Sequence, residues 1–372
     1  LNRYLKTFRA QGLHRFVAED LPNPKVLDQF QPVVKGGWAQ ALGPNQLVHL
    51  WAGNVPALPL WSLVCGLLAK AGNVGKLAST EPIFATVFVQ VLVQIEPRWQ
   101  DALALLWWEG GDTTLEAVAL QHAETVIAYG GDDTLHALKL RMPAGVRWLP
   151  HGHKLSFGLI AASTLSARHA PELVLAAAQD VARYDQGGCY SPHVFYVQRG
   201  GHVSPREWAE RLAQALNHQH ARHPRREPDP SEALALGAWR QQHEWADQQL
   251  LLTGEGGDVA YSDALLPLTP GPGLRCVQVV AFDRWEEVMQ LLPAARRWLQ
   301  TAGLAATPEA WPELALQLGR AGVTRVCAIG SMTAPEAGWH HDGGHSLRDF
   351  LRWVEVEQSL GLDAERYTPY SD

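Results

Sequence analysis

Short apolar segments that alternate with stretches of helical periodicity are the feature that most constrains the fold of this chain. The segments are rich in branched and aromatic residues, which favour strands, and the stretches between them carry apolar residues at helical spacing. This alternation is typical of an α/β fold with a largely parallel sheet. In such a fold, ligands bind at the carboxyl ends of the strands. The expected strands are Gly75–Leu77, Thr125–Tyr129, Val146–Leu149, Val194–Val197 and Val277–Phe282.

Composition limits the classes of protein to which the chain can belong. Its 372 residues are enough for two domains of ordinary size, and an apolar content of 47% excludes a disordered chain. Four cysteines are too few for a disulfide framework, which favours a reducing compartment, so we expect a cytoplasmic protein. The net charge of −7, from 31 basic and 38 acidic residues, argues against sequence-independent binding to nucleic acid.

One uncharged segment has the length of a membrane span. Leu50–Ala69 carries no charged residue over 20 positions, which is enough to cross the hydrocarbon core of a bilayer. The segment also contains Asn54, Pro56 and Pro59, and an amide and prolines are costly in lipid. We therefore predict a buried loop followed by a helix, and no membrane span.

A basic and proline-rich segment, His218–Ser231, is predicted to be a surface linker between two helices. Before it, Ser204-Pro205-Arg206-Glu207 has the sequence of a capping box with proline in the first turn. Asp229-Pro230-Ser231-Glu232 is predicted to open the second helix.

The sharpest local feature is a cysteine that directly follows two glycines, in the segment Asp185–Pro192 (DQGGCYSP). Glycines allow a tight turn and let backbone amides approach a reacting carbonyl. Cys189, in this position, is a candidate nucleophile that forms a covalent acyl intermediate. The alternative interpretation is a small buried residue beside a turn. Cys65, Cys276 and Cys327 lie within apolar runs and are interpreted as packing residues.

Gly130 and Gly131 follow an expected strand and precede a helical stretch. A turn of this kind presents backbone N–H groups to a phosphate, although it is not a G-x-G-x-x-G fingerprint, and an ordinary capped turn remains an alternative. Two histidine groups, His340–His345 and the set His218, His220 and His223, were considered as metal ligands. Adjacent histidines rarely chelate one ion from one face, and we expect no metal.

Five blocks of sequence together resemble a known family. They are Ala52–Pro56 with Gly75-Lys76, Ala128–Gly131, Gly152–Gly158, Asp185–Cys189, and Gly338–Gly343 followed by Arg352-Trp353. In this order they resemble the aldehyde dehydrogenase superfamily. More narrowly, they are similar to the Lux-type acyl-CoA reductases, which include the fatty-acid reductase of bacterial luminescence. Each block is weak by itself, but five in order over roughly residues 20–357 are specific.

The resemblance implies a role for each matching residue. Cys189 matches the catalytic nucleophile, and Asn54 matches the amide that forms an oxyanion hole with the Cys189 backbone N–H. Lys76 matches the lysine that contacts the adenosine ribose of the cofactor. Gly130 and Gly131 match the turn against the cofactor pyrophosphate.

Three departures from the superfamily's pattern narrow the expected chemistry. Pro150 stands where hydrolytic members have the glutamate that activates water, so hydrolysis of an acyl-enzyme is not supported. The glutamate that usually holds the nicotinamide ribose should fall near Gly271–Gly273 and is absent. Ser79 stands where NAD-preferring relatives often have a glutamate that would repel a 2′-phosphate, so Ser79 with Lys76 favours NADPH.

The resemblance thus implies reduction of a medium- or long-chain fatty acyl-CoA or acyl-protein thioester to the aldehyde by NADPH, through a thioester on Cys189. His153 and His193 are near in sequence and were considered as proton donors, with surface or core histidines as the alternative. Other possible activities are the reduction of an acyl phosphate and a cysteine-dependent acyltransferase or thioesterase reaction without nicotinamide. A non-enzymatic scaffold is disfavoured, since it would need neither Cys189 nor Asn54.

The resemblance also implies an architecture and partners. We expect an aldehyde-dehydrogenase-like α/β protein with a Rossmann-like NADP(H)-binding domain over residues 1–154 and an α/β catalytic domain over 155–330. Residues 331–372 form a C-terminal segment suited to an interface. The superfamily is usually dimeric or tetrameric, so a homo-oligomer is expected. Its luminescent members work with an acyl-protein synthetase, which makes such an enzyme a candidate partner.

Overall fold

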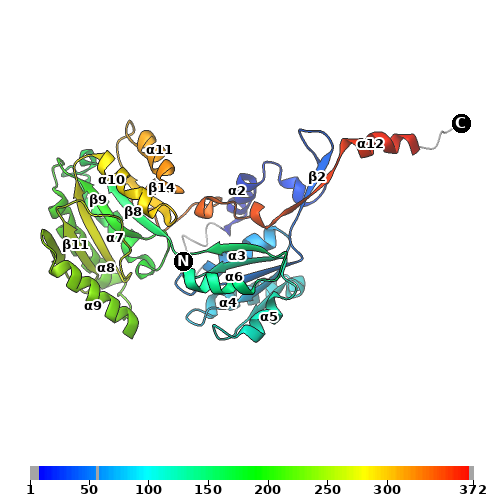
Figure 1. The fold of residues 1–372 in the computed structure, drawn as a ribbon, viewed down its shortest axis with the longest axis horizontal. Coiled ribbons are helices and arrows are strands. Elements are labelled where there is room, and N and C mark those ends of the chain that lie inside the picture. Colours follow the sequence, from blue (N-terminus) through cyan, green and yellow to red (C-terminus); the bar gives the residue numbers. More distant parts are fainter. Residues whose placement is uncertain (1–7, 56–57, 368–372) are drawn as a thin grey trace. The chain divides into compact units, whose positions relative to one another are not determined.

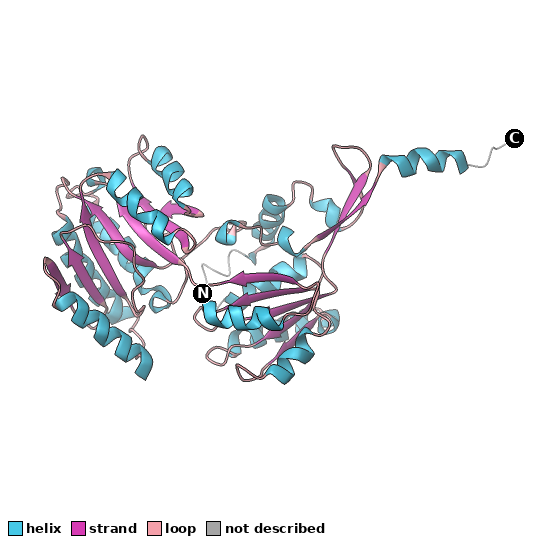
Figure 2. Cartoon of the chain, in the orientation of Figure 1, coloured by secondary structure: helices cyan, strands magenta, loops and turns pink. Residues whose placement is uncertain are grey.

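The chain forms two compact units, each with its own sheet (Figures 1 and 2). The computed structural model describes residues 8–55 and 58–367. The first unit runs to Gly152 and takes up the chain again from Glu336, and the second comprises His153–Pro335. The C-terminal segment, expected as a separate part from residue 331, belongs to the first unit from Glu336 onward.

The first unit contains a parallel five-stranded sheet with the order β5-β4-β3-β6-β7. Strands β4 and β5 follow one another on one side of β3, and β6 and β7 follow one another on the other side. The direction of winding therefore reverses between β3 and β6. Such a switch point leaves a crevice at the carboxyl ends of the two central strands. The strands are β3 (Gln46–Leu50), β4 (Gly72–Lys76), β5 (Leu103–Leu106), β6 (Thr125–Tyr129) and β7 (Arg147–His151).

Helices of the first unit precede these strands, connect them or, as α12 does, follow them in the chain. Within the segment that has the length of a membrane span, the predicted helix is confirmed as the largely buried α3, whereas the preceding loop is exposed at Asn54. No helix in residues 8–55 or 58–367 is long and apolar enough to span a membrane. Asp112 caps α5 by accepting hydrogen bonds from Thr114 N and Leu115 N. The helices are α2 (Ala10–Asp20), α3 (Leu58–Leu68), α4 (Ile83–Ile95), α5 (Thr113–Leu120), α6 (Asp132–Arg141) and α12 (Gln358–Ala364).

A small antiparallel sheet explains why the C-terminal segment belongs to the first unit. It contains β1 (Gln31–Pro32), β2 (Trp38–Leu42) and β15 (Arg352–Val356). β15 pairs with β2 in a register that places Val356 opposite Trp38. Arg147 at the start of β7 also donates hydrogen bonds to the carbonyl oxygens of Asp349 and Leu351, at 2.8 and 2.7 Å. Sequence periodicity gives no signal for pairing between strands so far apart in the chain.

The second unit contains a seven-stranded sheet with the order β10-β11-β12-β9-β8-β13-β14. Only β10, at one edge, runs antiparallel to its neighbour. The central strands are buried at almost every residue because helices cover both faces of the sheet. The strands are β8 (Leu155–Ile160), β9 (Pro192–Gln198), β10 (Gln249–Leu252), β11 (Asp258–Ser262), β12 (Cys276–Phe282), β13 (Leu299–Ala305) and β14 (Arg325–Ala328).

The predicted linker joins two capped helices of the second unit. Ser204 caps α8 by accepting a hydrogen bond from Glu207 N, and Asp229 forms a full capping box with Glu232 on α9. The first five residues of the predicted linker belong to α8, so the connection is shorter than expected. The helices are α7 (Ala170–Ala182), α8 (Pro205–Arg222), α9 (Pro230–Glu244), α10 (Trp285–Leu291) and α11 (Trp311–Ala321).

Each strand predicted from the sequence is confirmed, as β4, β6, β7, β9 and β12. Short 3₁₀ turns complete the described structure. They are Pro24–Leu27, Pro97–Asp101, Ala162–Thr164, Arg183–Gln186, Leu292–Ala295, His341–Gly343, Arg348–Phe350 and Glu365–Tyr367.

A buried histidine in β3 makes the stability of the first unit depend on pH. His49 lies between Ser62 Oγ (3.1 Å) and Asn73 Oδ1 (3.0 Å), and Trp51 donates to the same serine hydroxyl at 2.7 Å. Asn73 Oδ1 can only accept, so it holds the neutral tautomer with the proton on Nε2. Burial lowers the pKa of His49 from 6.5 to about 4.

We expect this histidine to destabilise the fold as the pH falls. The unfolded chain binds the proton near pH 6.5 and the folded chain only near pH 4, so the stabilisation is complete above pH 6.5 and is lost below it. Between pH 7 and pH 5 the loss is about 2 kcal/mol, at 1.36 kcal/mol per pH unit. Urea unfolding at both pH values checks this. His49→Gln should remove that part of the pH dependence, whereas the exposed control His136→Gln should not.

Candidate active site

The site residues predicted in the first unit gather at the carboxyl edge of its sheet. Asn54 follows β3, Lys76 ends β4 with Ser79 just beyond it, and Gly130 and Gly131 follow β6. Because these strands are parallel neighbours, their carboxyl ends meet at one edge. The edge includes the switch point between β3 and β6, where α/β folds bind their ligands.

The loop that carries Asn54 is packed against the loop that follows β4. A side chain on Gly53 would collide with the Thr80 hydroxyl, so glycine is required for this close approach. Asn54 itself is exposed at the surface of the chain. Its assignment to an oxyanion hole with Cys189 remains a prediction.

Lys76 lies in a partly buried, partly aromatic environment. Its Nζ lies 5.9 Å from the centroid of the Trp108 ring, a cation–π contact. Burial lowers the pKa of Lys76, and the nearby Glu116 carboxylate opposes this effect. A lysine placed here offers a positive charge to a ligand at the end of β4.

Ser79 presents no carboxylate near Lys76. Ser79 is exposed, and the next acidic residue along the chain, Glu81, turns toward α4, where Oε1 accepts a hydrogen bond from Phe84 N at 2.9 Å. Ser79 therefore supplies no negative charge that would repel a 2′-phosphate. The carboxylate of Glu81 is directed toward its own helix.

The predicted strand–Gly–Gly–helix turn is confirmed at the end of β6. Gly131 is the N-cap of α6 and has an ordinary φ of −68°. A Cβ on Gly131 would meet nothing within 4 Å, and a Cβ on Gly130 would meet only Thr134, at 3.7 Å. Neither backbone conformation nor packing requires glycine at position 131, so the space beside it fits a closely approaching ligand such as a pyrophosphate. Asp132 and Asp133 in the first turn place negative charge next to this space.

A polar cavity of about 180 Å³ lies in the first unit beside the same strand ends. Tyr129 and His151, at the ends of β6 and β7, form one side, and the C-terminal segment forms another. Two atoms that line it, Trp61 Nε1 and Ser346 Oγ, have no hydrogen-bond partner within residues 8–55 and 58–367. Polar atoms in this state indicate that a polar group or water binds here.

A histidine–aspartate pair lines this cavity, and sequence reasoning did not find it. His151 Nδ1 donates a hydrogen bond to Asp342 Oδ2 at 2.8 Å. The ring of His151 stacks on that of His341, with 4.3 Å between the ring centroids. The ring of Tyr129 also stacks on that of His151, with 4.8 Å between the centroids. The signal that could have found the pair is the position of His151, directly at the carboxyl end of a predicted strand.

The histidine groups considered as metal ligands do not gather as the sequence suggested. Among the described residues, three donor atoms come together at His151, His341 and Asp342, and at Asp20, His340 and His345, but not at His218, His220 and His223. The planes of His151 and His341 are parallel within 4°. A metal lies in the plane of each imidazole that binds it, so the two stacked rings do not fit one ion. The absence of a metal remains a prediction.

In the second unit, Cys189 lies at the amino end of β9, beyond the 3₁₀ turn Arg183–Gln186 that ends α7. Its carbonyl oxygen accepts a hydrogen bond from Ser156 Oγ at 2.8 Å, and this hydroxyl accepts one from Thr301 N at 3.1 Å. The preceding Gly188 leaves room for the Tyr190 ring, which would lie 2.5 Å from an added Cβ. The backbone of the cysteine is thus held from two neighbouring strands.

Three residues that approach Cys189 have left-handed backbone conformations although none is glycine. Their φ values are 55° at Tyr184, 49° at Asp185 and 66° at Gln186. A non-glycine residue in this region costs about 1–2 kcal/mol, so the surroundings must hold the loop in place. Strain of this kind is frequent at functional sites.

The other cysteines are poor candidates for a nucleophile. Burial raises the pKa of Cys276 to about 12 and that of Cys327 to about 11, and it raises the pKa of the buried Cys65 still further. Near pH 7 these three are thiols, not thiolates. Cys189 and Cys327 are both partly exposed, whereas Cys65 and Cys276 are buried. The raised pKa values disfavour the other three cysteines as nucleophiles, and the nucleophilic role of Cys189 stays a prediction.

Two further sequence predictions concern Pro150 of the first unit and His193 of the second. Pro150 lies within β7, where hydrolytic relatives would carry the glutamate, so no carboxylate is offered at this position. His193 is buried, and its Nδ1 accepts a hydrogen bond from Gly271 N at 3.0 Å. Burial lowers the pKa of His193 to about 4, so it is neutral near pH 7, as expected for a core histidine.

Comparison with known proteins extends over most of the chain. The profile of the family described as acyl-CoA reductase (LuxC) matches residues 1–353. The long-chain acyl-protein thioester reductase of Photorhabdus luminescens is 27% identical over 358 residues, which cover 93% of this chain and 71% of that protein. The protein of the same name from Vibrio harveyi is 23% identical over 359 residues, with the same coverage.

Solved structures show the same fold at low sequence identity. A putative aldehyde dehydrogenase PutA from Anabaena variabilis has a TM-score of 0.67 and 13% identity, and covers 93% of this chain and 78% of its own. An NAD-dependent benzaldehyde dehydrogenase from Corynebacterium glutamicum has a TM-score of 0.64 and 12% identity, over 88% and 72%. A bifunctional proline utilization A protein has a TM-score of 0.66 and 18% identity, and this chain spans 38% of its length.

The chain therefore has the fold of an aldehyde dehydrogenase, as predicted. Within this class, the family profile matches all but the last residues of the chain, and the curated relatives match over nearly the same extent. The chain belongs to the LuxC family of acyl-CoA reductases.

Proposed function

We propose that this protein reduces a long-chain acyl thioester to the aldehyde with NADPH, through a thioester on Cys189. The observation that carries the proposal is the position of Cys189, which is partly exposed in a loop that Ser156 holds and that resembles the family's nucleophile block. Burial raises the pKa of each of the other three cysteines. The relatives from Photorhabdus luminescens and Vibrio harveyi are named long-chain acyl-protein thioester reductases, which supports the substrate class.

The chain's own residues account for the steps of acyl transfer. The Cys189 thiolate attacks the carbonyl carbon of the acyl thioester, and the oxyanion accepts hydrogen bonds from the Asn54 amide and the Cys189 backbone N–H. The carbonyl re-forms, the carbon–sulfur bond of the incoming thioester breaks, and the carrier thiolate leaves. The acyl group is then a thioester on Cys189. Pro150 offers no carboxylate to activate water, so this position does not promote hydrolysis of the thioester.

NADPH, when bound, supplies the hydride that reduces the thioester carbon before the aldehyde leaves Cys189. The space beside Gly131 fits its pyrophosphate, and Lys76 would hold the adenosine ribose. Ser79, without a carboxylate, favours a 2′-phosphate over a free 2′-hydroxyl. Asp132 and Asp133 in the first turn of α6 place negative charge beside this turn, which opposes a phosphate there.

We further infer an acyl-protein substrate with its synthetase as partner, and a homo-oligomer. The acyl-protein substrate is supported by the names of the relatives, and the synthetase partner rests on the resemblance to the luminescent members of the family. The homo-oligomer is supported by apolar side chains exposed on the antiparallel sheet and α12, where Trp38, Trp353, Leu360 and Leu362 are each at least 43% exposed.

The loss of NADPH absorbance with a series of acyl-CoAs and acyl-carrier proteins tests the proposal. We expect oxidation that depends on chain length, is fastest with long chains and is faster with NADPH than with NADH. Release of carrier thiol without oxidation of either nicotinamide would favour a cysteine-dependent acyltransferase or thioesterase. Oxidation with an acyl phosphate but with no thioester would favour the reduction of acyl phosphates.

A further inference from the structure

Two loops at the amino edge of the second sheet have unusual backbone conformations. Tyr184–Gln186 precedes β9, and Gly273–Arg275 precedes β12. Strands β9 and β12 are parallel neighbours, so the two loops lie at the same edge. All three residues in each loop have positive φ, with 75° at Gly273, 53° at Leu274 and 61° at Arg275. Two adjacent runs of this kind require strong mutual contacts, because isolated residues rarely adopt this conformation.

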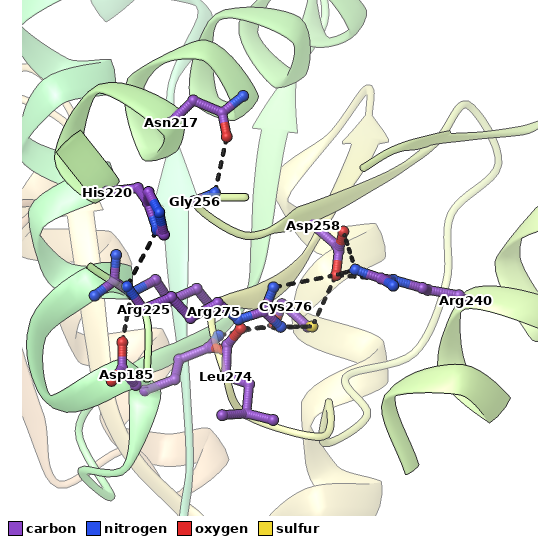
Figure 3. Close-up of polar contacts among 11 residues, drawn as sticks. Asp185, Asn217, His220, Arg225, Arg240, Gly256, Asp258, Leu274, Arg275 and Cys276 are labelled. Carbon is purple, nitrogen blue, oxygen red and sulfur yellow. Dashed lines mark hydrogen bonds and ion pairs between the residues drawn. The ribbon is translucent and has the colours of Figure 1, made fainter. Parts of the chain in front are cut away.

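The contacts between the loops converge on Asp185 (Figure 3). Arg275 Nε donates a hydrogen bond to Asp185 Oδ1 at 2.6 Å, and Leu274 N donates one to the Asp185 carbonyl oxygen at 3.0 Å. The next residue, Gln186, donates from Nε2 to the Cys276 carbonyl oxygen at 2.9 Å and to that of Pro192 at 2.7 Å. The loops are therefore joined through both side chain and backbone.

The pair Asp185–Arg275 is largely removed from water. The Arg275 side chain is 3% exposed and that of Asp185 is 15% exposed. The guanidinium also donates from Nη2 to the His223 carbonyl oxygen at 3.0 Å, and Asp185 Oδ2 accepts from Arg226 N at 3.3 Å. Charge-assisted bonds in such surroundings are strong, and removal of either partner leaves the other charge buried without compensation.

We propose that Asp185 and Arg275 are positioning residues that hold the Cys189 loop in its reactive conformation. Asp185 lies four residues before Cys189, and the segment between them contains two glycines that cannot fix the loop by themselves. The pair sets where the backbone N–H of Cys189 points, and so whether it can stabilise an oxyanion. This inference rests on the proposed function of Cys189 and adds to it the residues that hold the nucleophile.

A neighbouring ion pair supplies a matched control. Arg240 makes a bidentate contact with the fully buried Asp258, at 2.9 and 3.0 Å, on the adjacent strand β11 (Figure 3). Its partners do not include Asp185. Arg240→Gln therefore removes one of the two arginines that pair with the buried Asp258, the other being Arg225, and leaves the contact between Asp185 and Arg275 in place.

The experiment compares acyl-thioester reduction with alkylation of Cys189 by iodoacetamide. We expect Arg275→Gln and Asp185→Asn to lower kcat about 10- to 100-fold, since small displacements of a reacting group have effects of this size. Alkylation forms no oxyanion, so its rate should change less than about threefold, as should KM for NADPH. The double variant should be no slower than the slower single variant, and Arg275→Lys should recover part of the rate.

Asp185→Asn keeps the shape of the side chain, so this variant tests the proposal by itself if Arg275→Gln does not fold. The inference is overturned if both variants keep kcat within about threefold of the wild type, or if Arg240→Gln loses as much. It is also overturned if alkylation falls in parallel with kcat. A wild-type enzyme that oxidises no NADPH contradicts the proposed function instead. The pair is then tested by the rate of Cys189 acylation from p-nitrophenyl esters, measured by mass spectrometry of the intact protein.

Discussion

Replacement of Cys189 by alanine is expected to abolish acyl-thioester reduction, with a loss of about 10⁴-fold or more in kcat, because removal of a covalent nucleophile eliminates the acyl-enzyme. Two measurements check this. The loss of NADPH absorbance should fall to the background rate. In the absence of nicotinamide, the wild type mixed with a long-chain acyl-CoA should gain the mass of one acyl group, and Cys189→Ala should gain none.

The other cysteines provide matched controls for this prediction. Cys327→Ala removes a thiol whose pKa burial raises to about 11, and Cys276→Ala removes one whose pKa is raised to about 12. Both variants should keep the acylation step, although the cavity left at the fully buried Cys276 lowers stability. Acylation of the Cys189→Ala protein at another cysteine, with turnover retained, would contradict the assignment of the nucleophile.

Five strands could be predicted from the sequence because they stand out as short apolar segments between stretches of helical periodicity. β6 was predicted with the bounds that it has in the structure, and β12 within one residue. Gly130 and Gly131 could be predicted as a candidate site in the same way, since they follow such a strand. Asn54, Lys76 and Ser79 were predicted only from the resemblance to the family, because local pattern gives them no chemical role.

Contacts between distant residues could not be predicted in this way. His151 and Asp342 are 191 residues apart and Asp185 and Arg275 are 90 apart, so no periodicity relates them. The pairing of β15 with β2 also joins residues that are far apart in the sequence, and it places the C-terminal segment in the first unit. The left-handed conformations of Tyr184–Gln186 were equally hidden, because these residue types predict ordinary backbone and tertiary contacts override that preference.

Substitution of Asn54 is the second change with a large expected effect. Asn54→Ala should lower kcat for acyl-thioester reduction by about 10²- to 10³-fold, which is the usual effect of removing one donor from an oxyanion hole. KM for NADPH and the rate of alkylation of Cys189 by iodoacetamide should be unchanged, because neither depends on the oxyanion. Steady-state kinetics and alkylation followed by mass spectrometry measure these quantities.

A matched amide in the same unit separates this effect from a general loss of stability. Asn45 is also exposed, and its Nδ2 donates to Glu124 Oε1 at 2.6 Å, so Asn45→Ala removes an amide with a structural hydrogen bond. It should leave kcat within about threefold of the wild type, as expected for a surface contact. If Asn54→Ala also remained within this range, Asn54 would not stabilise the oxyanion. The Cys189 N–H and a donor other than Asn54 would then have to account for acyl transfer.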